Sequence, residues 1–228
     1  MSGLPNVSTI RERIQTTPKK EAKFCLMSAY LFCARISEVI GYTHPSDLAK
    51  TKARGPTGND VKLSTYELGP VKEQVVVFTV HTAKRGGKKR NVALPLDPKY
   101  EPWTEPLYDY FQEFGNDSVF PFTRQKACSY ARRIFGKLSY PIDDYKLWIG
   151  GKPQSIKAHN KLFRTHALRH LRATELIEDY RFDGIDLSVY GGWTLRSMIG
   201  VGSAMSRYAH LDWGRYFPKL LKEFSDNY

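Results

Sequence analysis

Arg35 is the first residue whose surroundings demand a chemical explanation, because it lies in the otherwise apolar run YLFCARISEVI. A buried guanidinium without a partner is costly, so this side chain needs either a carboxylate or an anionic ligand. Glu38 lies three residues further along and offers a carboxylate within reach on a helix. The sequence leaves open whether Arg35 only forms this ion pair or also binds an anion.

The segment HALRH places His166 and Arg169 three residues apart on a predicted helix, with His170 beside them. Both side chains then lie on one helix face. Arginine offers a planar fork of fixed charge for phosphate oxygens, and an imidazole can donate or accept a proton near neutral pH. A solvated polar face is the simpler explanation when this motif is taken alone.

A cationic segment, KRGGKKR at Lys84–Arg90, connects two β-like runs at Gln74–Val80 and Asn91–Leu96. The pattern predicts a hairpin with a strongly positive tip. Lys84 begins the tip, where a lysine on a flexible stem can reach a phosphate or a leaving oxygen. The other cationic residues of the tip suit contacts with DNA phosphates, and they are Arg85, Lys88, Lys89 and Arg90.

Two aromatic residues near the C-terminus are further candidates. Trp193 follows Gly192 at the start of a glycine-punctuated stretch, and its indole N–H can donate a hydrogen bond but cannot titrate. Tyr208 lies in SRYAHL, after that stretch. Nothing local distinguishes Tyr208 among the 14 tyrosines, because tyrosines usually pack in cores or interfaces.

The elements that must position these residues are mostly helices. Apolar and aromatic residues recur at helical spacing in five segments, which are Pro18–Ile40, Glu105–Phe114, Arg124–Leu138, Phe163–Tyr180 and Tyr216–Phe224. Residues 1–17 are interpreted as a lead, Lys50–Asn59 as a basic loop and Ser139–Asn160 as a polar connection. The predicted fold class is α+β, mainly α, with a small antiparallel sheet in one domain over residues 1–228.

The composition points to a folded basic domain. The chain has 228 residues, 41% of them hydrophobic, and 35 Lys plus Arg against 23 Asp plus Glu give a net charge of +12. Such a domain most often binds nucleic acid, although acidic proteins and lipid head groups stay open. No apolar run has the roughly 20 residues of a membrane helix, and the three cysteines lack ligand spacing. We therefore expect a cytoplasmic, DNA-associated protein without disulfide, metal or membrane span.

The joint order of these motifs resembles the catalytic domain of the tyrosine recombinases, the family of integrases and of Xer-like and Cre-like enzymes. The order is RISE, a strand–lysine–strand hairpin, HALRH, Gly-Trp and RYAHL. The similarity covers about Pro18 to His210, and it implies the DNA breaking-rejoining fold. It also implies a site-specific recombinase or integrase, for example of an archaeal, viral or other mobile element.

The resemblance implies that Tyr208 attacks the scissile phosphate, giving a 3′-phosphotyrosine and a free 5′-hydroxyl. The covalent link conserves the bond energy, so no ATP, metal or redox cofactor is implied. Arg35 and Arg169 would hold the nonbridging phosphate oxygens in the transition state. The implied partners are double-stranded DNA and further copies of the chain, as a dimer or tetramer on DNA.

The resemblance assigns the remaining roles to four residues. Lys84 would protonate the departing 5′ oxygen, and His166 would assist proton transfer at the tyrosine. Trp193 stands where relatives have histidine or tryptophan, and it would position the phosphate or pack against the site. His170 would support the helix face or contact DNA.

Two departures from the family pattern stand out. Fifteen positions separate Trp193 from Tyr208, which implies either an insertion around Ile199–Ser203 or a wrong assignment of Trp193. An insertion would give a tether long enough to serve a neighbouring subunit. Tyr190 and Tyr216 are alternative nucleophiles. Fewer than twenty residues precede the first predicted catalytic helix, which indicates a separated catalytic fragment or a small enzyme. The tail, residues 212–228, is predicted to pack on its own core or on a neighbouring protomer.

Two alternative functions remain open from the sequence. A type IB topoisomerase shares the implied fold and chemistry but reseals one strand in place. A non-catalytic DNA-binding descendant would lack one of the catalytic residue types, whereas all are present here. A metal-dependent nuclease is disfavoured because no carboxylate cluster has the spacing to hold Mg²⁺.

Overall fold

The computed structural model describes residues 3–43, 52–53, 55–82, 88–149, 152–193 and 212–224, and the fold is α+β. The helices are α1 (Val7–Gln15), α2 (Lys20–Leu31), α3 (Ile36–Ile40), α4 (Thr104–Gln112), α5 (Arg124–Phe135), α6 (Thr165–Glu178), α7 (Gly184–Gly191) and α10 (Phe217–Leu220). The strands are β1 (Tyr42–Thr43), β2 (Lys52–Ala53), β3 (Val61–Leu68), β4 (Val71–His81), β5 (Lys89–Pro95), β6 (Ser139–Ile142), β7 (Tyr145–Ile149), β8 (Lys152–Ile156) and β9 (His159–Leu162).

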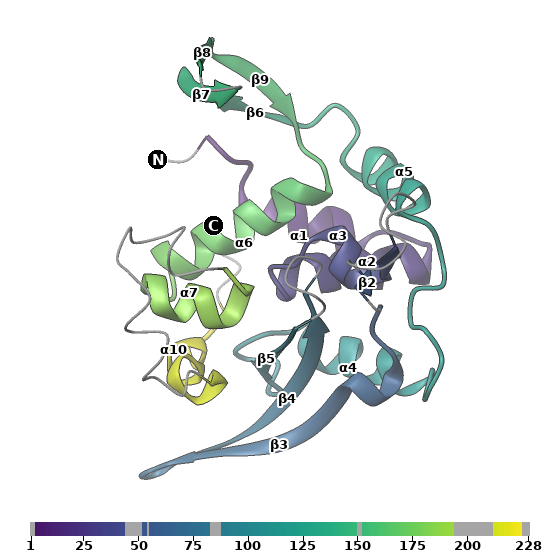
Figure 1. The fold of residues 1–228 in the computed structure, drawn as a ribbon. Helices are drawn as coiled ribbons and strands as arrows, with labels where there is room; N and C mark the ends of the chain where they lie inside the picture. Colours follow the sequence, from purple (N-terminus) through teal and green to yellow (C-terminus); the bar gives the residue numbers. More distant parts are fainter. Residues whose placement is uncertain are drawn as a thin grey trace.

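Strands β3, β4 and β5 form an antiparallel sheet with β4 in the middle. The predicted hairpin is confirmed as β4–β5, and β3 adds a third strand. Residues 75–78 of β4 are all buried, which requires cover on both faces of the sheet. Phe78 packs on Phe32 and Phe111, with ring centroids 4.8 and 5.1 Å apart. Figure 1 shows the sheet beneath α2 and α3, with α10 to its left.

The predicted helix Pro18–Ile40 is wrong as one element. Helix α2 ends at Leu31 and α3 begins at Ile36, because Cys33 takes a left-handed backbone with φ of 47°. The Cys33 thiol donates a hydrogen bond of 3.2 Å to the carbonyl of Arg169, which ties this turn to α6. The break places Arg35 at the start of α3, so its orientation is set by the turn and not by a continuous helix.

The predicted lead, residues 1–17, contains a helix. In α1, the side chain of Asn6 accepts a hydrogen bond of 2.8 Å from the backbone of Ser8, which caps the helix. Ile10 and Ile14 lie four residues apart and are fully buried in the core. This amphipathic pattern was too short to be recognised beside the long apolar run that follows.

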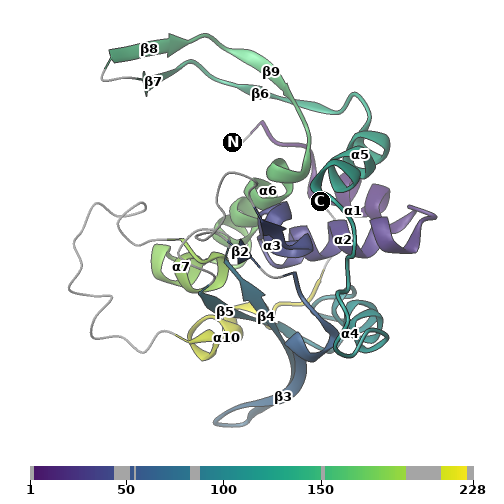
Figure 2. The same cartoon turned by 45° about the vertical axis from the view of Figure 1, so that its right-hand side comes forward.

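The predicted polar connection, Ser139–Asn160, is largely β-structure. Strand β6 pairs with β9, and β7 pairs with β8, both antiparallel. Together they form an arm, residues 139–149 and 152–162, which projects from the body at the top of Figures 1 and 2. No period-2 apolar pattern in the sequence indicates this arm, because most of its residues whose burial is described are exposed.

The predicted tail helix, Tyr216–Phe224, is shorter than expected. Helix α10 covers only Phe217–Leu220, and the Phe224 N–H then donates a hydrogen bond of 2.6 Å to the carbonyl of Lys99. Phe217 and Leu220 are buried, and Phe217 packs on Tyr66 of β3 with centroids 4.8 Å apart. Within the described residues 212–224, the tail therefore packs on its own chain.

Asp186 anchors this tail to α7. Its carboxylate is fully buried and accepts hydrogen bonds from Arg215 Nε at 2.8 Å and Lys219 Nζ at 2.5 Å. Replacing Asp186 by alanine should lower the free energy of unfolding by about 2 kcal/mol, because both charge-assisted bonds are lost. Urea unfolding measures the loss, and limited proteolysis should cut the tail more readily.

Asp117 supplies the control for this prediction, because it is an exposed aspartate on a loop. Asp117→Ala should change the free energy of unfolding by less than about 0.5 kcal/mol. Equal stability of the two variants would show that Asp186 does not anchor the tail.

None of the described helices is long and apolar enough to cross a membrane.

Candidate functional site

Arg35 and Arg169 converge on one carboxylate, that of Glu38 in α3. Arg35 Nη1 donates to Glu38 Oε1 at 2.9 Å, and Arg169 Nη1 donates to Glu38 Oε2 at 3.4 Å. The Arg35 backbone N–H also donates to Oε2, at 3.0 Å. Two arginines far apart in the sequence thus share one site. The ion pair between Arg35 and Glu38, one of the two possibilities that the sequence left open, is formed in the structure.

Arg90 is a third guanidinium at this site, and it is buried in the body instead of exposed at the hairpin tip, while its predicted contact with DNA stays a prediction. Only 6% of its side chain is exposed, and its Nη2 lies 3.8 Å from Glu38 Oε2. Nη2 also donates to the carbonyl of Phe32 at 2.8 Å, and Nη1 donates to the carbonyl of Tyr190. Arg90 is drawn inward because the strand period puts it on the same face of β5 as buried Val92. That alternation was the sequence signal for its burial.

The charges at this site do not balance. Burial acts to raise the pKa of Glu38, but Arg90, the Arg35 backbone and Arg169 hold it below its usual value. Burial lowers the pKa of Arg169 to about 10; Cys33 and Glu38 oppose this shift, and the positive charges of Arg90 and Arg35 add to it. Three guanidinium groups therefore face one carboxylate, an arrangement that favours binding of an anion.

Trp193 packs on Arg169, with the guanidinium carbon 4.1 Å from the ring centroid. Arg169 Nη2 also donates to the carbonyl of Gly191 at 3.0 Å, so the end of α7 is held against α6. Gly192 has φ of 68°, and a Cβ there would lie 2.9 Å from Arg90 Cδ. Glycine is required at this position both for its backbone conformation and for the close approach of Arg90.

His166 and His170 lie exposed on α6, with ring centroids 4.6 Å apart. The pKa of His166 is lowered to about 4, first by loss of hydration and then by the positive charges of His170, Arg169, Lys161 and Arg35. Loss of hydration also lowers the pKa of His170, and Lys161 and Arg169 add to the effect. His166 is therefore neutral at pH 7, the state in which an imidazole can accept a proton.

DNA binding should raise the pKa of His166, because a phosphate anion beside the ring favours its protonated form. By linkage, affinity for DNA should increase as the pH is lowered from 6.5 toward about 4, whereas the free protein should lose stability over the same range. NMR titration of the ring signals with and without a duplex measures the shift. His166→Gln should remove the pH dependence, and an unchanged ring pKa would contradict the prediction.

The other predicted site residues fall into two groups. Lys84, Arg85 and Tyr208 lie outside the described residues. Lys88 and Lys89 are exposed where the chain enters β5, as expected for DNA contacts.

The two alternative nucleophiles are buried tyrosines. The Tyr190 hydroxyl donates to the carbonyl of Leu31, and burial raises its pKa to about 12. The Tyr216 hydroxyl accepts from the Ala93 N–H at 2.9 Å, and burial raises its pKa. Both phenols are fully buried, so neither can reach a phosphate on the surface without unfolding around it.

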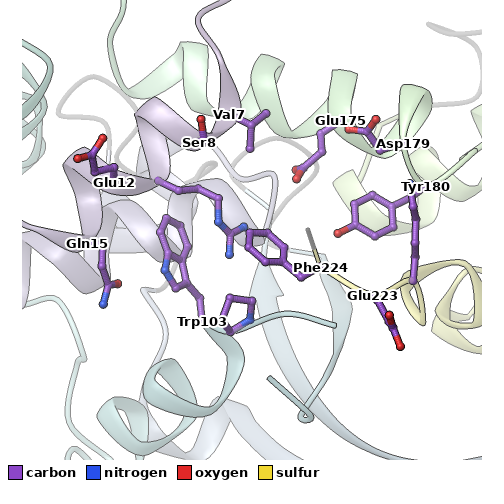
Figure 3. Close-up of a pocket in the computed structure, with 13 residues that line it drawn as sticks. Val7, Ser8, Glu12, Gln15, Trp103, Glu175, Asp179, Tyr180, Glu223 and Phe224 are labelled. Carbon is purple, nitrogen blue, oxygen red and sulfur yellow. The ribbon is translucent and has the colours of Figure 1, made fainter. Parts of the chain in front are cut away.

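A pocket lies elsewhere, between α1, the end of α6 and the tail (Figure 3). It holds about 330 Å³. Within it, the Arg11 guanidinium lies 4.1 Å from the ring centroid of Trp103 and 4.5 Å from that of Phe224. Arg11 is paired with the buried carboxylate of Glu101, so this charge is already satisfied inside the fold.

No group of three or more His, Cys, Asp or Glu side chains that could hold a metal ion occurs in the described part of the chain. The site consists of guanidinium, imidazole and indole groups around one carboxylate, which suits an oxyanion. No protein-family model, no curated protein and no solved structure matches this chain, so the assignment of function rests on the residues of the site.

Proposed function

We propose that this protein is a tyrosine recombinase of the integrase kind, which cleaves and rejoins DNA strands through a phosphotyrosine. The observation that carries the proposal is the convergence of Arg35 and Arg169 on Glu38, with a third guanidinium beside them. The motif order anticipated that the first two would meet. The proposal includes the DNA breaking-rejoining fold, self-association on DNA and a cytoplasmic, DNA-associated location.

The reaction needs no external energy. The Tyr208 hydroxyl oxygen bonds to phosphorus while the bond from phosphorus to the 5′ oxygen breaks. His166, neutral at pH 7, accepts the tyrosine proton, and Lys84 gives a proton to the leaving 5′ oxygen. Arg35 and Arg169 stabilise the charge on the nonbridging oxygens. Attack by another 5′-hydroxyl reverses each step and releases the tyrosine.

Covalent attachment to DNA tests this proposal. In a pool of nicked duplexes with randomised sequence around the nick, the short fragment that carries the free 5′-hydroxyl diffuses away after cleavage, which traps the intermediate. Incubation in the presence of EDTA should give complexes that survive denaturant, and mass spectrometry should map the nucleotide to the peptide containing Tyr208. Absence of any attachment across salt and pH conditions, or its mapping to another residue, would overturn the proposal.

The trapped DNA also separates the recombinase from the topoisomerase alternative. Two marked duplexes carrying the selected sequence should exchange strands when mixed with the protein. Relaxation of supercoiled plasmid by a monomer without such exchange would instead support a type IB topoisomerase. Binding without attachment would support the non-catalytic DNA-binding descendant.

A further inference from the structure

The arm, residues 139–149 and 152–162, is a two-stranded ribbon that projects from the body (Figures 1 and 2). Among residues 152–162 every side chain is exposed except that of Ile156, which is half-buried. A two-stranded ribbon without further cover is marginally stable in water. The exposed ribbon therefore has the form of a surface that is completed by a partner.

The exposed part of the arm is polar and basic. Lys152, Lys157 and Lys161 are exposed, and none of them forms an ion pair with any described residue. The acidic residues of the arm are Asp143, which is exposed, and Asp144, whose carboxylate accepts a hydrogen bond from a backbone N–H of the arm. The unpaired lysines favour a negatively charged partner over an apolar one.

One face of the arm is turned toward the candidate site. His159 and Lys161 lie on the same face of β9, because side chains alternate along a strand. Lys161 pairs with Tyr140 across the ribbon, and Tyr140 is buried against the body near Phe163. The positive charge of Lys161 also acts on His166 and His170 at the start of α6. The same basic face thus continues from the site onto the arm.

We propose that the arm lies along the duplex that enters the candidate site, with Lys157 and Lys161 on its phosphates and His159 facing the groove. A two-stranded ribbon fits the major groove, which is about 12 Å wide. Residues two apart on one strand face are separated by about 6.8 Å, which equals the rise of two nucleotides. The inference rests on the proposed function only for the identity of the partner as DNA.

His159 gives the arm a means of reading sequence. Its Nδ1 lies 3.0 Å from the carbonyl oxygen of Lys157, and since a carbonyl only accepts, Nδ1 must carry the proton. Nε2 of the neutral ring is then an acceptor. In the major groove the amino groups of cytosine and adenine are donors, so an acceptor on the arm discriminates between base pairs.

The reach of the arm sets the length of DNA it contacts. At about 3.4 Å per residue, the ten steps from Ser139 to Ile149 span at most about 34 Å. This length corresponds to about ten base pairs. A duplex that fills only the site would miss the arm, whereas a longer duplex would meet both.

The experiment compares affinities for intact duplexes of about 12 and about 35 base pairs, at salt concentrations from 50 to 200 mM. Lys157→Gln combined with Lys161→Gln should reduce the slope of log affinity against log salt by about 2 on the long duplex. Over this fourfold rise in salt, the wild type should lose about tenfold more affinity than the variant. On the short duplex the two proteins should agree.

The matched control removes the same charge elsewhere. Lys20 and Lys72 are exposed and already paired with Glu113 and Glu67. Lys20→Gln combined with Lys72→Gln should leave the slope within about 0.5 of the wild type on both duplexes. His159→Ala should flatten the sequence preference among selected long duplexes without changing the slope.

Two results would overturn the inference. One is an unchanged slope on the long duplex for the Lys157 and Lys161 variant. The other is that the Lys157 and Lys161 variant forms a protein–DNA complex of different mass from the wild type in sedimentation, while the affinity per protomer is unchanged. That result would show that the arm contacts another copy of the chain and not DNA. Both measurements use intact DNA and do not depend on cleavage. If no covalent attachment occurs but the Lys157 and Lys161 variant has a reduced salt slope, the proposed chemistry is rejected and the inference that the arm contacts DNA stands.

Discussion

Tyr208→Phe should abolish covalent attachment to nicked DNA, with a rate reduced by at least about four orders of magnitude. Phenylalanine lacks the oxygen that would bond to phosphorus, so no route to the intermediate remains through this residue. Binding of intact duplex should stay within about twofold, because the net charge is unchanged. The measurement is the time course of denaturant-resistant complex on the trapped substrate.

The control for this variant is a tyrosine to which the resemblance assigns no role. Tyr108 is partly buried on α4, and Tyr108→Phe should attach to DNA at the wild-type rate. Undiminished attachment by Tyr208→Phe would disprove the nucleophile assignment. Since Tyr190 and Tyr216 are buried, another tyrosine would then have to be sought by peptide mapping.

Arg169→Lys should reduce the rate of attachment by about 10²- to 10³-fold, the usual effect of removing one donor to a developing oxyanion. Arg169 donates from two nitrogens, to Glu38 at 3.4 Å and to the carbonyl of Gly191 at 3.0 Å. A lysine keeps the charge but cannot bind two partners and a phosphate in one plane. Affinity for DNA should therefore change little while the chemical step slows.

Arg132→Lys on the exposed face of α5 is the matched control and should attach at the wild-type rate. Because Arg169 is only 2% exposed, its variant could unfold, which circular dichroism would reveal. Arg35→Lys then carries the same test, since 31% of the Arg35 side chain is exposed. Full activity of both lysine variants would show that these guanidiniums serve only the fold.

The sequence was sufficient to predict a helix or strand where its apolar residues recur with a clear helical or strand period. The helix Phe163–Tyr180 and the hairpin runs at Gln74–Val80 and Asn91–Leu96 were predicted with ends within a few residues of α6, β4 and β5. The break between α2 and α3 was not predictable, because it depends on a left-handed Cys33 that bonds to the carbonyl of Arg169. A contact between distant residues overrides the helical pattern there.

The candidate site shows the same division. From the sequence, the resemblance of the motif order to the tyrosine recombinases predicted that Arg35, Arg169 and His166 would meet at one site, and the structure brings the two arginines together on Glu38. Only the tertiary structure decided that Glu38 is their common partner, that Arg90 turns inward to join them, and that Trp193 packs on Arg169. The physical reason is that a charge is buried only where several chain segments supply its partners together, and such a meeting of segments leaves no mark in any one of them.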